Sequence, residues 1–147
     1  MHPSLTGGVL VATDGSTSAA RAETVAATIA AGCKCKLVIL TISRGLPADE
    51  LRRLAHTEGD LGAARHALIE QILEGAVDRA KRAGVTDIEP ISEPGDPAAT
   101  IVSTAARERV DLIVLGRRGL GGLQQLLLGS ASKAVVDHAR CAVTVVP

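Results

Sequence analysis

The sequence predicts an α/β fold: one five-stranded parallel sheet with helices on both faces, a Rossmann-like three-layer sandwich. Short apolar runs rich in Val, Ile and Leu alternate along the chain with segments whose apolar residues recur at helical spacing. Strands that alternate with helices in this way form parallel sheets covered on both faces. The chain has 147 residues, the size of one ordinary domain, and neither a linker nor a repeat divides it. We therefore expect residues 1–147 to form a single domain.

Five segments are expected to be strands. They lie at residues 8–13, 36–42, 87–92 and 110–115 and at Ala142–Val146. The first two are apolar runs of the kind that is buried on both faces of a sheet. The third contains Pro90, which has no amide hydrogen and is therefore expected at an edge. The last is apolar and would expose unpaired backbone groups in a monomer. We therefore expect a homodimer formed through Ala142–Val146.

Helices are expected between these strands, and several of their ends are marked by single residues. Gly32 follows an Ala-rich segment and is a typical residue just beyond a helix end. Asp96 and Pro97 mark a helix start, because Asp caps free amides and Pro fits the first turn. The polar stretch 43–59 is expected to be irregular, with room for a short helix at 48–55. The expected helices span residues 16–31, about 60–84, 97 onward and Ser130–His138.

Two loops are placed to bind a ligand. In parallel sheets of this kind, ligands bind beyond the carboxyl ends of the strands, where the strand order reverses. Residues 13–16 follow the first strand, and a glycine-rich segment begins at Gly116, where the fourth strand ends. We expect these two loops to form the binding site.

The glycine-rich segment has the composition of a phosphate-binding loop. It reads Gly116-Arg117-Arg118-Gly119-Leu120-Gly121-Gly122 and, after a leucine-rich stretch, Gly129-Ser130-Ala131-Ser132. Glycines let a backbone approach phosphate oxygens. The second run opens a helix, whose free amides and positive dipole end attract anions, and the Ser130 and Ser132 hydroxyls can donate further hydrogen bonds. Neither common nucleotide motif is present: the P-loop lysine is missing, and a dinucleotide fingerprint starting at Gly119 fails at Gln124.

The spacing Gly116-x2-Gly119-x9-Gly129-Ser130 resembles the G-x2-G-x9-G-[ST] motif of ATP-binding universal stress proteins. The opening VLVATDGS is similar to the first strand and acidic turn of that family. Gly95-Asp96-Pro97, the later VDLIVLG and the closing CAVTVVP are similar as well, so the resemblance covers nearly the whole chain. It implies a regulatory stress-response protein, a sensor or adaptor, that binds ATP or another adenine nucleotide, alone or with Mg²⁺.

The resemblance also implies roles for single residues. Asp14 would contact the ribose or a nucleotide-bound Mg²⁺, and Ile42 would pack on the adenine. Ala12 and Thr13 would contribute backbone contacts. The ribose and phosphates would be framed by Gly116, Arg117, Arg118 and Gly119. The phosphates would be held by Gly129, Ser130, Ala131 and Ser132. The chain departs from the family at Thr41, where many members have His, and at Arg117, where a small residue is common.

The composition argues against several other functions. Lys plus Arg and Asp plus Glu both number 16, and there are no aromatic residues. A nucleic-acid binder needs a basic surface, and base stacking needs aromatic rings, so we expect no nucleic-acid partner. No apolar run approaches the roughly 20 residues of a membrane span, and the start lacks the pattern of a signal peptide. With an odd number of cysteines, three, we expect a cytoplasmic protein without a membrane partner.

Some alternatives stay open on the residues alone. Asp14 before Gly15 is also ordinary turn chemistry. Cys33-x-Cys35 could bind a soft metal, although no second pair lies at ligand spacing. The protein could be a slow ATP hydrolase or an adenylyl-transfer enzyme, although the sequence places no base and no second acidic residue. It could also prefer AMP or cyclic AMP. The arginines of residues 79–82 are expected to be solvated.

Overall fold

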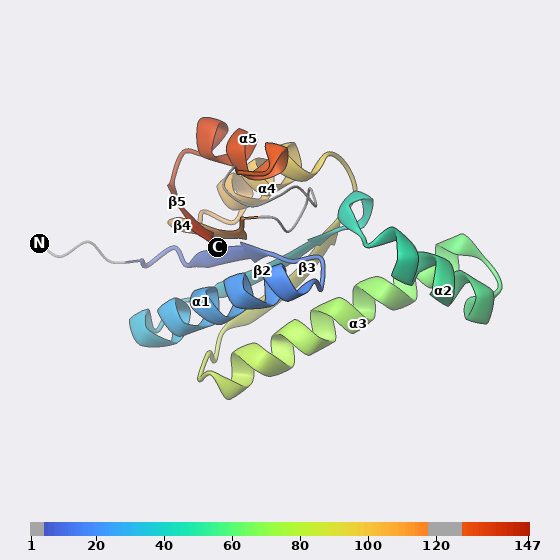
Figure 1. The fold of residues 1–147 in the computed structure, drawn as a ribbon. Helices are drawn as coiled ribbons and strands as arrows, with labels where there is room; N and C mark the ends of the chain where they lie inside the picture. Colours follow the sequence, from blue (N-terminus) through green and yellow to red (C-terminus); the bar gives the residue numbers. More distant parts are fainter. Residues whose placement is uncertain (1–4, 118–127) are drawn as a thin grey trace, which may run out of the picture.

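The computed structural model describes residues 5–117 and 128–147 and shows alternating strands and helices (Figure 1). Five strands form one parallel sheet in the order β3-β2-β1-β4-β5, which confirms the predicted fold class. The elements are β1 (Val9–Ala12), α1 (Thr17–Cys33), β2 (Leu37–Ile42), the 3-10 turn η1 (Ser43–Gly45), α2 (Ala48–Glu58), α3 (Leu61–Arg82), β3 (Ile88–Glu93), α4 (Pro97–Arg107), β4 (Leu112–Gly116), α5 (Ser130–His138) and β5 (Ala142–Val146).

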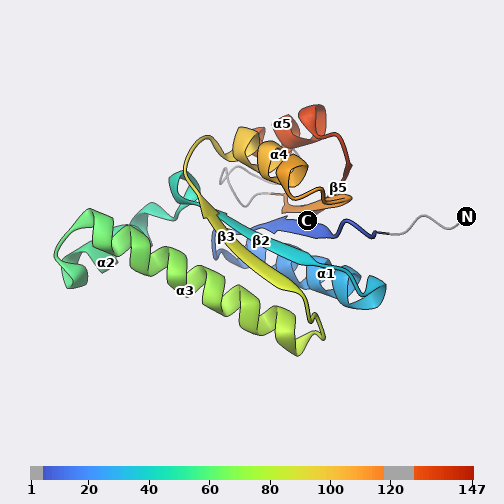
Figure 2. The ribbon, with the colours of Figure 1, turned by 180° about the vertical axis from the view of Figure 1, so that it is seen from behind.

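The helices cover both faces of the sheet (Figures 1 and 2). α1 and α3 pack on one face and α4 and α5 on the other. Alternate residues of the strands point to opposite faces, so β1 contributes Val9 and Val11 to the first core and Leu10 to the second. Burying each such side chain stabilises the fold by about 1.5–3 kcal/mol.

α1 lies close to the sheet because the residues of its inner face are small. Ala19, Ala22, Ala26 and Ala30 are at most 2% exposed, and they face the sheet together with one acidic residue, Glu23. Alanine also has the highest helix propensity. A core without aromatic rings is thus filled by branched side chains from the strands and by alanines from the helix.

Most element boundaries differ from those expected by one or two residues, and three of the differences have structural detail. α1 does not end at Gly32; Lys34 adopts the left-handed conformation (φ 54°) and its amide donates to the carbonyls of Ala30 and Ala31. β4 begins at Leu112, and the preceding Asp111 accepts the Gly7 amide on its carboxylate at 2.7 Å. The stretch 43–59 is mostly helical, with α2 longer than the short helix expected.

α2 is helical because it packs against α3. This tertiary contact cannot be predicted from the polar composition of the segment. Leu51 and Leu54 are half-buried, and the two helices form a hairpin that extends beyond the sheet (Figure 2). Gly59 ends α2 at φ 88°, and Asp60 begins α3 by accepting the Ala63 amide at 2.8 Å.

The two edges of the sheet are β3, which contains Pro90, and β5, as the sequence predicts. Among the described residues, no helix has both the length and the apolar character needed to cross a membrane.

Candidate functional site

The strand order reverses between β1 and β4. After β1 the chain builds β2 and β3 on one side, and it then returns to place β4 and β5 on the other. The carboxyl ends of β1 and β4 therefore meet at the point where parallel sheets bind ligands. Residues 13–16 and Gly116 follow these two strand ends, as expected from the sequence.

Gly116 forms the junction of the site. A Cβ atom on this residue would lie 3.1 Å from the Ser18 carbonyl oxygen and 3.2 Å from the Ser18 hydroxyl oxygen, in the first turn of α1. The Gly116 carbonyl accepts a hydrogen bond from the Ser132 hydroxyl at 3.2 Å, in the first turn of α5. A larger residue would push α1 away from β4, so the close approach explains the glycine.

The N-terminus of α5 has the free amides to which an anion could bind. Its first helical hydrogen bond runs from the Lys133 amide to the Gly129 carbonyl at 2.9 Å. The amides of Ser130, Ala131 and Ser132 precede this bond and have no acceptor within the helix. Ser130 is exposed and Ala131 half-buried, so an anion can reach this turn and its dipole.

Two of the expected phosphate donors make protein contacts here. The Gly129 amide donates to the Arg117 carbonyl at 3.3 Å, and the Ser132 hydroxyl donates to Gly116. Both bonds hold α5 against the end of β4, so the amides of the first turn are better candidates for phosphate contacts than these two groups. Arg118 and Gly119, also expected at the site, lie outside the described residues.

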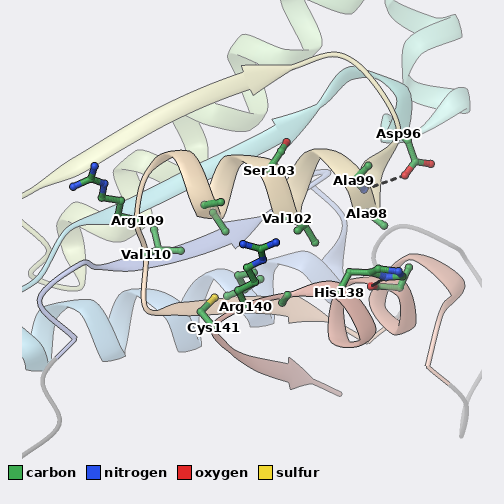
Figure 3. A pocket seen from close by; sticks show the side chains of 15 residues that line it. Asp96, Ala98, Ala99, Val102, Ser103, Arg109, Val110, His138, Arg140 and Cys141 are labelled. Atoms are coloured by element: carbon green, nitrogen blue, oxygen red, sulfur yellow. Dashed lines mark hydrogen bonds between the residues drawn. The ribbon is translucent and has the colours of Figure 1, made fainter.

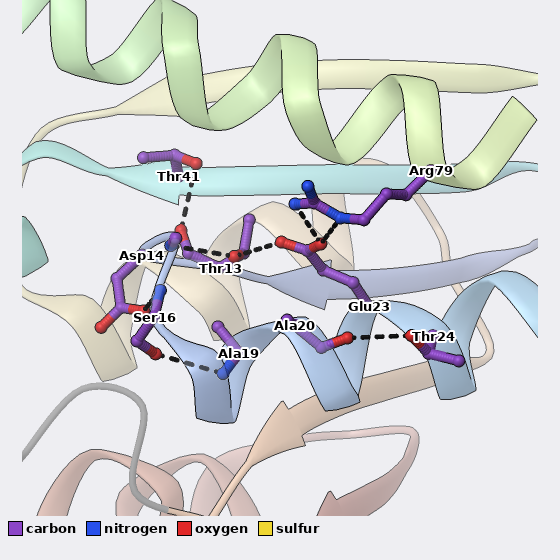
Figure 4. A network of polar contacts seen from close by, with 10 residues as sticks. Thr13, Asp14, Ser16, Ala19, Ala20, Glu23, Thr24, Thr41 and Arg79 are labelled. Atoms are coloured by element: carbon purple, nitrogen blue, oxygen red, sulfur yellow. Dashed lines mark hydrogen bonds and ion pairs between the residues drawn. The ribbon is translucent and has the colours of Figure 1, made fainter.

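Thr13 is held at every polar atom (Figure 4). Its amide donates to the Leu40 carbonyl at 2.9 Å, and its carbonyl accepts from the Thr41 hydroxyl at 3.1 Å. Its hydroxyl accepts from the Gly15 amide at 3.2 Å and donates to a Glu23 carboxylate oxygen at 2.6 Å. The backbone that enters the loop after β1 is therefore fixed before any ligand binds.

Asp14 shapes the turn. One of its carboxylate oxygens accepts the Ser16 amide at 2.9 Å, the local bond by which Asp forms turns. Ser16, and not Asp14, caps α1, since its hydroxyl accepts the Ala19 amide at 3.1 Å. Gly15 has φ 80°, and a Cβ there would lie 2.9 Å from a side-chain carbon of Ile72 on α3. The turn-making role of Asp14 is thus present alongside any contact with a ligand.

Ala12 and Ile42 end β1 and β2 beside this loop. Both are buried and belong to the core on the side of α4 and α5.

Sequence reasoning missed four residues near the site: Ser18, Thr41 as a hydrogen-bond donor, Glu23 and Arg79. Arg79 is exposed, as expected, but it also binds the buried Glu23 carboxylate. A signal existed for Glu23, because it is an acidic residue beside the alanines of an otherwise apolar helix face.

The largest cavity described lies elsewhere, between α4 and α5 (Figure 3). It measures about 660 Å³ and is lined mostly by small apolar side chains such as Ala98, Val102 and Ala134. Arg140 and Cys141 lie along it, and Asp96 at one end caps α4 through the Ala99 amide. None of the described residues expected at the site lines this groove.

The cysteines do not form a metal centre in the described part of the chain, where no three His, Cys, Asp or Glu side chains cluster. Burial, and then the neighbouring Cys33, raise the pKa of the Cys35 thiol, and burial raises that of Cys141. The raised pKa values favour the protonated form of both thiols, which is the less nucleophilic one.

Comparison with known proteins connects this geometry to a family. The profile of the Universal stress protein family matches residues 7–147. The chain belongs to the universal stress protein family. A protein of Staphylococcus haemolyticus described as a universal stress protein is 38% identical over 141 residues, which cover 94% of this chain and 82% of that protein.

Solved structures of universal stress proteins share the fold. UspA from Lactobacillus plantarum superposes with a TM-score of 0.79 at 26% identity, covering 99% of this chain and 100% of the other. A universal stress protein in complex with cAMP superposes with a TM-score of 0.73 at 35% identity, covering 97% and 98% of the two chains.

Proposed function

We propose that this universal stress protein binds an adenine nucleotide where β1 and β4 end, and that it acts as a sensor or adaptor rather than as an efficient catalyst. One observation carries the proposal. Gly116 contacts the first turns of both α1 and α5, so the acidic loop after β1 and an anion-binding helix N-terminus share one site. A nucleotide offers a ribose to the first and phosphates to the second.

The proposed contacts follow from this arrangement. The phosphates lie at the amides of Ser130 and Ala131 and at the Ser130 hydroxyl, with Arg117, Arg118 and Gly119 beside them. The adenine packs near Ile42 and the backbone of Ala12 and Thr13, and Asp14 faces the ribose.

A magnesium ion fits this site only as part of the nucleotide. Mg²⁺ is commonly held by one or two carboxylates together with substrate phosphates. Asp14 is the acidic residue of the loop, and the Ser16 amide occupies one of its oxygens. Asp14 would supply one ligand to an ion that the phosphates carry.

ATP is the ligand that the glycine spacing favours, and cAMP is the second candidate. The G-x2-G-x9-G-[ST] spacing supports a nucleotide with several phosphates. The relative solved with cAMP is 35% identical over nearly the whole chain, which supports a cyclic monophosphate. AMP presents the same base and ribose.

The sensor role is favoured over catalysis because efficient phosphoryl transfer needs a positioned nucleophile and charge stabilisation. The loop after β1 offers Asp14 as its single carboxylate on the ligand side, and the buried Glu23 is already engaged by Thr13 and Arg79. Slow hydrolysis or adenylyl transfer is the alternative function.

Two further parts of the proposal concern the assembly and the compartment. We propose a homodimer that pairs two copies of β5, and a cytoplasmic location, which suits three free thiols.

Two measurements test the proposal. Mass spectrometry of gently purified protein identifies a co-purifying nucleotide, and isothermal titration calorimetry measures the affinities for ATP, AMP and cAMP. We expect micromolar or tighter binding of at least one. Failure to bind all three would overturn the proposed function.

A further inference from the structure

Glu23 is a buried carboxylate that no contact with a ligand explains. It is 5% exposed and stands on the inner face of α1 among alanines. A charged group in such a place is costly unless it is paired and hydrogen-bonded. Both conditions are met here, and the two partners come from different parts of the fold.

The two oxygens of Glu23 serve different partners (Figure 4). One accepts the Thr13 hydroxyl at 2.6 Å. The other accepts Nε of Arg79 at 2.8 Å and lies 2.6 Å from its Nη2. Glu23 thereby connects α3, which carries Arg79, to the loop that follows β1.

The ion pair fixes the direction of the hydrogen bonds in the loop. An ionised carboxylate only accepts, so the proton of the Thr13 hydroxyl must point to Glu23. The oxygen of that hydroxyl is then left to accept the Gly15 amide, which it does at 3.2 Å. Arg79 pairs with the Glu23 carboxylate, and its 44% exposed side chain keeps contact with water.

α3 restrains the same loop at a second point. Ile72, also on α3, leaves no room for a Cβ atom at Gly15. One helix thus determines both where the Gly15 backbone lies and which hydrogen bond its amide makes.

We propose that Glu23 is a positioning residue of the nucleotide site, and that Arg79 holds its carboxylate in place so that it orients Thr13, Gly15 and the Asp14 turn for the ligand. This inference rests on the proposed function. Glu23 itself touches no ligand, and its effect on affinity passes through the Thr13 hydroxyl.

Three variants and one control test the inference. Glu23→Gln keeps the size of the side chain but has an amide that can donate as well as accept, so the direction of the Thr13 bond is lost. Thr13→Val removes the hydroxyl, and Arg79→Met removes the cation. Arg107→Met is the matched control, because Arg107 forms ion pairs with Glu93 and Glu108 and ends α4, which packs on the opposite face of the sheet from α1 and α3.

Two readouts are measured for each variant. Calorimetry gives the affinity for the nucleotide that the wild type binds, and NMR hydrogen exchange of the Gly15 amide reports loop order without ligand. We expect Glu23→Gln and Thr13→Val each to weaken binding about tenfold, the effect of one ordinary hydrogen bond, and to accelerate Gly15 exchange by a similar factor. The double variant that combines Thr13→Val with Glu23→Gln should also bind about tenfold more weakly than the wild type, because both changes remove the same interaction. Arg107→Met should change neither readout, even if it lowers the melting temperature.

The outcomes separate this inference from the proposed function. Unchanged Gly15 exchange in Glu23→Gln overturns the inference. So does faster exchange with unchanged affinity, since Glu23 would then have only a structural role. A wild type that binds none of the three nucleotides overturns the proposed function and with it any effect on affinity. If Arg79→Met does not fold, Glu23→Gln decides, because it leaves no buried charge.

Discussion

The Ser132 hydroxyl donates a hydrogen bond to the Gly116 carbonyl oxygen at 3.2 Å and so joins the first turn of α5 to the end of β4. The Gly129 amide adds a second bond, to the Arg117 carbonyl. The position of the helix N-terminus relative to the sheet is therefore set by contacts within the protein. A phosphate that binds there meets amides that are already oriented, which lowers the entropy cost of binding.

Gly129→Glu is expected to abolish nucleotide binding while preserving the fold. Gly129 has φ −60°, which any residue adopts, and a Cβ there would lie 3.4 Å from the Arg117 carbonyl, an ordinary contact. The added carboxylate would stand beside the phosphates. Like charges about 4 Å apart repel by roughly 1 kcal/mol in water and by more in a partly desolvated site, and lost phosphate hydrogen bonds add roughly 1.5–3 kcal/mol each. Calorimetry should show a loss on the order of a thousandfold.

Ser130→Ala should weaken nucleotide binding less than Gly129→Glu does. It removes one hydroxyl but leaves the amides of the first turn, so we expect a loss of about tenfold. Equal affinities of wild type and Gly129→Glu would contradict a phosphate site at this helix.

Asp14→Asn should distinguish the role of Asp14 in the turn from its proposed role in binding Mg²⁺. The Asn side chain still accepts the Ser16 amide and preserves the turn, so the melting temperature should stay within about 1 °C. Loss of the charge should weaken Mg²⁺·ATP binding about tenfold and cAMP binding less, because cAMP meets Asp14 through its ribose alone and does not chelate Mg²⁺ through a polyphosphate chain. Equal losses for both nucleotides would place Asp14 at the ribose only and contradict a role in holding Mg²⁺.

ATP turnover should fall far below the typical enzyme value of about 10 s⁻¹, because residues 5–117 and 128–147 position no base near the proposed phosphate site. Release of phosphate is followed with wild type and with Gly129→Glu, purified in parallel. Turnover near the typical value that is lost in the variant would favour an enzyme.

Val145→Pro should convert a dimer formed through β5 into a monomer. The Val146 carbonyl accepts the Arg117 amide from the side of β4, and successive residues of a strand direct their backbone groups to opposite sides. The Val145 amide therefore faces away from β4, so proline removes a donor from the open edge and preserves the sheet. Light scattering at micromolar concentration measures the mass, and Val145→Ala is the control. A monomeric wild type would count against the dimer.

The ion pair between Lys36 and Glu89 makes stability depend on pH. The hydrogen bond from Lys36 lowers the pKa of Glu89 below its usual 4.5, and the same bond raises the pKa of Lys36 above 10.5. The contribution of Glu89 is complete above the usual carboxyl pKa and disappears as the pH falls through the lowered value. That of Lys36 is complete below 10.5 and disappears as the pH rises through the raised value.

Lys36→Met should therefore lower the melting temperature most between about pH 5 and 10. Both side chains are more than one third exposed, so the pair contributes at most about 1 kcal/mol, or about 2–4 °C. Thermal unfolding of both proteins from pH 7 to 2.5 should show the difference shrinking below pH 4.5. A difference that persists at pH 2.5 would mean that lost packing of the Lys36 chain, and not its charge, is responsible.

Much of the fold could be predicted from the sequence because the decisive signals are local. Apolar runs predicted the strands, and Asp96 with Pro97 predicted the start of α4. Helix α2 is longer than expected because it packs on α3, and the sequence of α2 alone does not show that tertiary contact.

The candidate site was predictable in its location but not in its hydrogen bonds. Alternating strands and helices implied that the ends of β1 and β4 would meet, and the spacing of the glycines marked the second loop. The sequence does not show which carbonyl accepts the Ser132 hydroxyl or that an arginine on α3 reaches Glu23. Both contacts depend on distances between elements that are far apart in the chain.

The two borders of the sheet are chemically unequal. Pro90 removes a donor from β3, and α3 flanks that strand with the acidic side chains of Glu70, Glu74 and Asp78. At the other border, β5 is free of proline and of charged residues. Strand addition is therefore favoured only at β5. In the proposed dimer the two copies would cover β5 on each other and leave no open edge for a third copy. Growth would then stop at a closed pair, and the apolar strand that favours association would also protect the protein against fibre formation.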